Sequence, residues 1–180
     1  MPRLPRLMRL VTAFALCFAF ALSGCVSTKI QSNRDASFTG TVERLYVLAS
    51  VAEREQGMAN LFTTAIEQHL AAHGVPARAH VRDPLALEGE ELVTREVEAF
   101  GPSAILVLTQ TESSAMISGA GGGTNSAVFD ASLFDTESER RIWRASIKAS
   151  RDRIYATEQQ GARNLAEKIV EKLAEDGLLG

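Results

Sequence analysis

Three histidines come closest to the residue types and spacing of a metal site. His69 and His73 are four residues apart, which places two imidazoles on one face of a helix, and His80 follows as a possible third ligand. The residues between the first two include no Glu, so the H-E-x-x-H arrangement of zinc peptidases is absent. Because two histidines without a carboxylate partner rarely hold zinc specifically, we interpret all three as surface residues and expect no metal.

Candidates for nucleophilic or acid–base catalysis fail on their context. The chain contains no G-x-S-x-G motif. Asp130 and Asp135 are five residues apart in an expected strand, so their carboxylates should lie on opposite faces, with Asp130 on the wet face and Asp135 in the turn. General acid–base catalysis needs convergent groups. We therefore predict no catalytic residue and no cofactor.

The most distinctive local feature is a glycine-rich segment, GAGGGTN. It contains Gly119, Gly121, Gly122, Gly123 and Asn125. It lacks the Lys-Ser/Thr ending of a phosphate-binding loop, and it joins two expected strands instead of opening a helix. Two interpretations stay open: a solvated hairpin tip, or a loop that becomes ordered against a partner or a second copy of the chain.

The densest basic stretch lies between Arg140 and Arg153, where Arg144 and Lys148 share the outward face of an expected strand. It is either a solvated sheet face balanced by nearby acids, or a patch for anionic lipid headgroups, an acidic partner or a cell-wall polymer. The whole chain has 19 Lys and Arg against 22 Asp and Glu, a formal charge of -3. This balance gives no electrostatic signature of nucleic-acid binding.

The first 24 residues have the pattern of a secretory signal peptide. Arg3, Arg6 and Arg9 form a positive start, and the apolar run Leu10–Leu22 follows. That run is shorter than the roughly 20 residues that a membrane-spanning helix needs. We expect residues 1–24 to be removed.

The residues Leu22-Ser23-Gly24-Cys25 resemble the lipobox of bacterial lipoproteins. The resemblance implies cleavage between Gly24 and Cys25, a diacylglycerol on the Cys25 sulfur and a further acyl chain, such as palmitate, on the new N-terminus. Two or more chains anchor a protein stably in a membrane. Val26, where an Asp would signal retention in the inner membrane, implies the outer membrane by analogy with Gram-negative sorting.

Residues 25–43 are expected to be the lipidated cysteine and a flexible tether, because the stretch after Cys25 is polar and rich in Ser and Thr. Cys17 would leave with the signal peptide and Cys25 would carry lipid. The mature chain would then have no free thiol, which suits an oxidising periplasm and excludes a cysteine nucleophile.

Residues 44–180 should form one globular periplasmic domain of α/β (α+β) class. Its expected order is β-α-β-α-β-β-β-α, with a mixed sheet of about five strands, an antiparallel C-terminal meander and three covering helices. Trp143 falls on the apolar face of the last strand, and Thr157 with Gln160 suggests a capping box for the last helix. The expected strands are 45–51, 76–82, 103–111, 127–134 and 142–149, and the expected helices are 53–73, 88–100 and 157–175.

This order, with the lipobox, resembles small Gram-negative envelope lipoproteins of unknown function. Their domain looks like that of the curli-secretion lipoprotein, the lipoprotein activator of penicillin-binding proteins and the N-terminal domain of the Tol translocation protein. The likeness rests on the segments 100–108, 129–135 and 142–144. It implies a non-enzymatic role in binding a partner.

Three functions follow in order of preference. The first is a lipid-anchored module on the periplasmic face of the outer membrane that binds or assembles an unknown envelope protein. The second is a subunit that self-associates into a homo-oligomer through the meander edge or the glycine-rich hairpin. The third, least favoured, is a hydrolase of envelope polymer, because no convergent site is visible.

Overall fold

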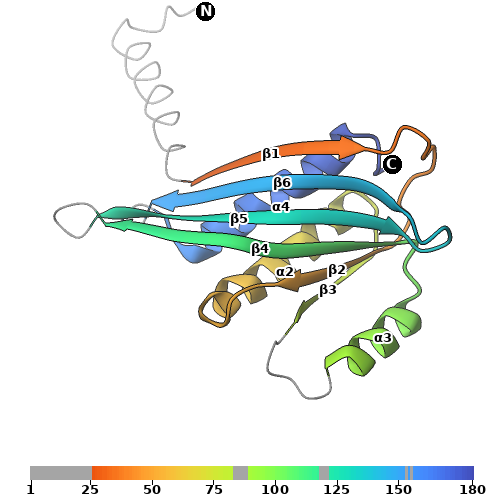
Figure 1. Ribbon diagram of the computed structural model, residues 1–180, viewed down its shortest axis with the longest axis horizontal. Helices are drawn as coiled ribbons and strands as arrows, with labels where there is room; N and C mark the ends of the chain where they lie inside the picture. Colours follow the sequence, from red (N-terminus) through yellow and green to blue (C-terminus); the bar gives the residue numbers. More distant parts are fainter. Residues whose placement is uncertain (1–25, 83–88, 118–121, 153, 155) are drawn as a thin grey trace, which may run out of the picture.

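Six strands form one mixed sheet in the order β1-β6-β5-β4-β2-β3 (Figure 1). The computed structural model describes residues 26–82, 89–117, 122–152, 154 and 156–180. Together the six strands and three helices make a single α+β domain, as predicted. The elements are β1 (Val26–Arg34), β2 (Leu45–Ser50), the 3-10 turn η2 (Glu53–Glu55), α2 (Gln56–Ala72), β3 (Ala77–Arg82), α3 (Gly89–Phe100), β4 (Ala104–Ile117), β5 (Gly123–Asp135), β6 (Arg141–Asp152) and α4 (Glu158–Glu175).

The sheet changes from parallel to antiparallel at β4. Strand β2 runs parallel to β3 on one side and to β4 on the other, because α2 returns the chain from β2 to β3 and α3 returns it from β3 to β4. Strands β4, β5, β6 and β1 then pair antiparallel. The expected meander is confirmed, and β3 is an edge strand.

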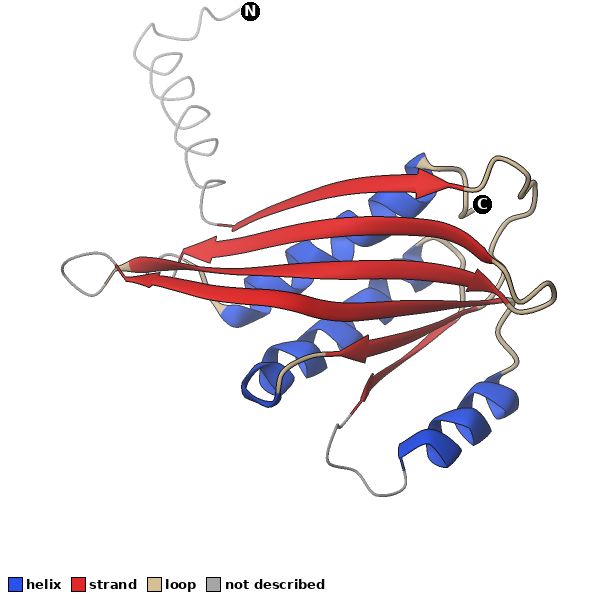
Figure 2. Ribbon diagram, viewed as in Figure 1, coloured by secondary structure: helices blue, strands red, loops and turns tan. Residues whose placement is uncertain are grey.

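Helices α2 and α4 cover one face of the sheet and lie behind it in Figure 2. The strands bury alternate side chains against them, as Leu106 and Leu108 show on β4. Trp143, only 1% exposed, is the largest fully buried side chain, which confirms its predicted place in the core. The capping box of α4 is also present: Thr157 Oγ1 accepts from the Gln160 N–H, and Gln160 Oε1 accepts from the Thr157 N–H.

Helix α3 reaches the opposite face at the β2–β3 edge. Tyr46 points away from its buried neighbours Leu45 and Val47, and its ring contacts that of Phe100 with centroids 6.2 Å apart. The Tyr46 hydroxyl donates to Glu96 Oε2 at 3.0 Å. Burial, aided by this bond, raises the pKa of Tyr46 above its ordinary value. The contact fastens α3 to the sheet.

The expected tether is wrong for residues 26–34, which form the edge strand β1. All nine pair with β6, from Val26 opposite Arg151 to Arg34 opposite Trp143. The side chains that face α4 find partners there: Thr28 Oγ1 bonds Asn164 Oδ1 at 2.8 Å, and Ser32 Oγ donates to Asp176 Oδ2 at 2.6 Å. The edge of β6 would otherwise be open, and it thus provides hydrogen-bond partners for the backbone N–H and C=O groups of this polar segment.

The end of α4 joins three elements through one carboxylate. Asp176 accepts from Trp143 Nε1 on β6 at 2.7 Å and from Ser32 on β1, and it pairs with Lys172 Nζ at 2.9 Å. Arg34 Nη1 donates to the Asp176 carbonyl at 2.6 Å. Strand β1 is therefore part of the folded domain.

Candidate functional site

A cavity of about 470 Å³ lies between the sheet and the first turns of α2 and α4. Strands β4, β5 and β6 extend past these helix starts, so the helices cover the sheet incompletely there (Figure 1). Its lining includes Arg54, Ser113, Asn125, Ala127, Ala149 and Arg151.

The strand register explains why this space is open. Ile30, Ile147 and Phe129 stand in one row across the helix-facing side and fill the core. The next row holds Thr28, Ala149, Ala127 and Ser113, whose side chains are all small. The side chains are large in the first row and small in the row next to it on the same face. The small side chains do not fill the space below the helices, and a cavity results.

Charged side chains stand at the outer rim of this cavity. Arg54 donates to Ser113 Oγ and lies 3.4 Å from Glu55. Arg151, whose side chain is 16% exposed, donates to the Ala156 carbonyl at 2.7 Å and lies 3.8 Å from Glu158. Each arginine thus has an acidic neighbour, so the rim has no excess charge of either sign among these groups.

The glycine-rich segment is only partly described. Gly119 and Gly121 lie outside the described residues, as do Gly24 and Cys25. Gly122 is buried, and β5 begins at Gly123, where an added Cβ would collide with the Met116 carbonyl oxygen. Asn125, expected in the loop, lies inside β5 and lines the cavity. The loop is therefore shorter than expected, because β5 already begins at Gly123.

Arg144 and Lys148 lie on the other side of the sheet, away from Asn125. They belong to a surface that we call the open face, formed by alternate residues of β1, β6, β5 and β4 that no described helix covers. Its residues include Lys29, Gln31, Asn33, Val107, Thr109, Glu112, Val128, Asp130, Ser132, Arg144, Ser146 and Lys148, and Glu112 ends the row that runs from Lys29 through Lys148 and Val128. The structure thus separates two groups of predicted binding residues.

Charge is unevenly neutralised on the open face. Arg144 has a partner in Asp130, with 3.4 Å between Nη2 and Oδ2. Lys29 stands directly opposite Lys148 in the β1–β6 register, and both side chains are exposed. Within the described part of the chain neither lysine forms an ion pair. Like charges directly opposite one another in a sheet repel, so this pair favours an anionic partner. Lys29 carries no local signal in the sequence, because its pairing with Lys148 depends on β1.

The three histidines do not converge. His73 Nδ1 bonds the His69 carbonyl at 3.0 Å within the end of α2, while His80 Nδ1 lies 3.3 Å from Glu96 Oε2. No group of three potential metal ligands occurs among the residues that the structure describes. Asp130 lies on the open face, and Asp135 accepts from Ser138 in the β5–β6 turn at 2.8 Å, as predicted.

The fold and the open face define a small α+β domain with an uncovered sheet surface. Neither a protein-family model nor a curated protein sequence matches the chain. In the described parts of the chain, no helix combines the length and apolarity needed to cross a membrane.

Solved bacterial proteins have a similar backbone. The PelC dodecamer of Paraburkholderia phytofirmans matches with a TM-score of 0.52 and 14% identity, covering 82% of this chain and 97% of that one. Protein XCC0632 of Xanthomonas campestris matches with a TM-score of 0.52 and 8% identity, covering 83% and 93%. Lipoprotein GNA1162 of Neisseria meningitidis has a TM-score of 0.45 and 16% identity, covering 74% and 96%. At these identities the likeness establishes the fold alone. The resemblance to the curli-secretion lipoprotein group stays a prediction.

Proposed function

We propose that this chain is an outer-membrane lipoprotein, anchored through Cys25, whose periplasmic domain binds an anionic envelope partner on the open face without catalysis. The observation that carries the proposal is the unneutralised pair Lys29 and Lys148 on an uncovered sheet. The lipobox supports the anchor, because residues 22–25 have the spacing that lipid attachment requires.

Anchoring and binding support each other in this arrangement. Lipid holds the domain close to the membrane, which raises its effective concentration for any partner at the same surface. The partner class is an acidic protein segment. Long-range attraction to Lys29 and Lys148 would raise its association rate, and this effect would weaken as salt increases.

Photo-crosslinking in cells tests this function. A photoreactive residue at Ser146, exposed on the open face between Arg144 and Lys148, should capture one protein in stoichiometric yield. The matched control carries the same residue at Gln68, exposed on α2. Capture at neither position, or equal capture at both, would contradict a partner on the open face.

Charge reversal sharpens the same experiment. Lys148→Glu should reduce the yield at Ser146 several-fold, because it replaces one member of the lysine pair with an acid. Arg163→Glu changes the charge equally at an exposed position on α4 and should leave the yield unchanged. A mass spectrum of the N-terminal peptide checks the anchor separately by showing acyl chains on Cys25.

Self-association is the second candidate function, and the likeness to the PelC dodecamer favours it. The edge strands β1 and β3 and the open face would supply surfaces for neighbouring copies. Light scattering of the full lipidated chain in detergent measures the number of copies. A monomer would exclude this candidate, while a ring-sized mass would replace the foreign partner with a second copy.

A further inference from the structure

Three exposed apolar side chains gather at one end of the sheet. Met116 is 74% exposed, Ile117 75% and Ile154 58%, and these are the highest values among the large apolar residues that the structure describes. Met116 and Ile117 end β4, and Ile154 follows β6 by two residues. Exposed apolar groups that cluster mark a contact surface more often than scattered ones do.

The strand register places the start of β1 at the same end. Val26, Arg151, Asn125 and Ala115 form one continuous row across β1, β6, β5 and β4. Met116 and Ile117 come after Ala115 on β4, and Ile154 comes after Arg151 on β6, so all three lie at or beyond this row. We call Met116, Ile117 and Ile154 the apolar end.

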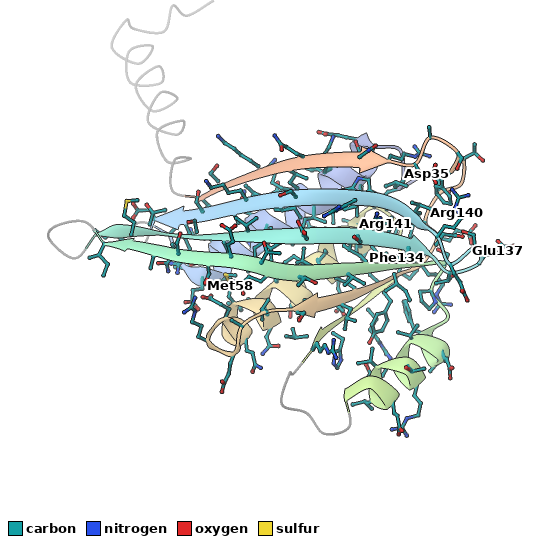
Figure 3. The ribbon with its side chains drawn as sticks, in the orientation of Figure 1. Asp35, Met58, Phe134, Glu137, Arg140 and Arg141 are labelled. Carbon is teal, nitrogen blue, oxygen red and sulfur yellow. The ribbon has the colours of Figure 1, made fainter. Side chains whose placement is uncertain are left out.

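The other end of the sheet is charged. Asp35, Glu137, Arg140 and Arg141 gather there in Figure 3, and Arg140 Nη2 pairs with Asp35 Oδ2 at 2.7 Å. Strand β5 has 13 residues between the two ends, a separation of about 40 Å at the usual rise per residue. At the end where β1 begins, the three most exposed apolar side chains of the described residues lie near the charged rim of the cavity, whereas the opposite end carries the Arg140–Asp35 pair.

Cys25 directly precedes Val26, the first residue of β1, in the sequence. Strand β1 is fixed from Val26 onward by its pairing with β6 and by its bonds to α4. Acyl chains on Cys25 therefore hold this end of the sheet against the bilayer with no flexible spacer. A protein partner would have to enter between this end and the membrane.

We propose that the apolar end enters the lipid headgroup region. In this orientation, which we call the seating of the domain, its long axis points outward from the membrane surface. This proposal rests on the lipid anchor of the proposed function. The membrane then leaves the open face uncovered, and this face is exposed to the periplasm along its length. Apolar side chains contribute to binding at such an interface by leaving water.

Fluorescence quenching by brominated lipid tests the seating. The full lipidated chain is reconstituted in vesicles of phosphatidylethanolamine and phosphatidylglycerol, with one thiol-reactive NBD label at Ile117→Cys or, as control, at Glu137→Cys. We expect brominated acyl chains to quench the label at 117 at least threefold more than the label at 137. The unsubstituted chain should take no label, since Cys25 carries lipid.

One further variant, a double substitution, separates the causes. With the label at 117, Met116→Ser plus Ile154→Ser should lower quenching about twofold, and circular dichroism should be unchanged because both positions are exposed. Equal quenching of the labels at 117 and 137, in a chain whose Cys25 is acylated, would contradict the proposed seating of the domain but not the lipid anchor. Absence of acyl chains on Cys25 overturns both. Protection of the label at 117 that appears only in a multimer overturns the seating in favour of a second copy.

Discussion

The indole of Trp143 donates to the carboxylate of Asp176 across 2.7 Å and thereby links the start of β6 to the end of the last helix. The same carboxylate accepts from Ser32 on β1. One acidic residue thus holds the N-terminal strand, the core tryptophan and α4 together. Strand β1 depends on this junction for its place in the fold.

Trp143→Ala should lower the free energy of unfolding by about 3–5 kcal/mol, because it leaves a large cavity in the core. Trp143→Phe retains most of the apolar bulk but loses the N–H, and we expect a smaller cost of about 1–3 kcal/mol. Urea unfolding followed by circular dichroism measures both. Equal losses for the two variants would show that the ring which Phe retains contributes nothing, and that the whole loss comes from what both variants remove, the bond to Asp176 among it.

Asp176→Asn should remove part of the acid sensitivity of the fold. Burial alone would raise the pKa of Asp176, but bonds from Lys172, Ser32 and Trp143 together outweigh it, so the pKa lies below its usual value. Because the folded-state pKa is the lower one, the stabilisation is complete above the unfolded pKa, near about 4. It is lost as the pH falls through the folded-state pKa.

The measurement is the difference in unfolding free energy between the original chain and Asp176→Asn at several pH values. This difference should be constant between about pH 5 and 7 and shrink below about pH 4. A difference that grows on acidification would mean that the folded-state pKa is raised instead. Glu175→Gln, beside it on the exposed side of α4, provides a control with little expected effect.

Ala127→Leu should cost less than about 1 kcal/mol, because its side chain would extend into the cavity beside α2 and α4. Ala131→Leu, on the same strand and the same face, enters a fully packed core and should cost about 1–3 kcal/mol. Thermal unfolding compares the two. Similar losses would show that the cavity is filled when the protein is in solution.

Gly123→Ala should destabilise the β4–β5 hairpin, since the added Cβ would meet the carbonyl of Met116 and the backbone would have to move. We expect a loss of about 1 kcal/mol or more, the usual scale for overpacking. Gly57→Ala, in the first turn of α2 with nothing near its Cβ, should stabilise by about 0.4–1 kcal/mol. A neutral Gly123→Ala would show that the hairpin has another accessible conformation.

Local sequence patterns predicted most elements of the domain to within a few residues. Apolar spacing located α2 and α4, and the alternation around Trp143 identified a strand with one buried face. The expected β4 ended too early and the expected β5 began too late, because the outer halves of both strands carry small and polar residues. Pairing between the two strands continues there without an apolar core to mark it.

Strand β1 shows where local patterns fail. Val26, Thr28 and Ile30 alternate with polar residues, which is a weak strand signal that a polar composition obscured. What makes the segment a strand is the free edge of β6 and the partners on α4, all more than 100 residues away in the chain. A polar segment forms a strand only when such distant groups satisfy it.

By itself the sequence determined the targeting pattern at Leu22–Cys25, the type of nearly every element and the absence of a recognisable catalytic motif, because each of these depends on neighbouring residues. Only the tertiary structure decided that Lys29 faces Lys148, that Met116 and Ile117 share an end with Val26, and that small residues in one row open a cavity. These features arise from strand register, which pairs residues far apart in the chain.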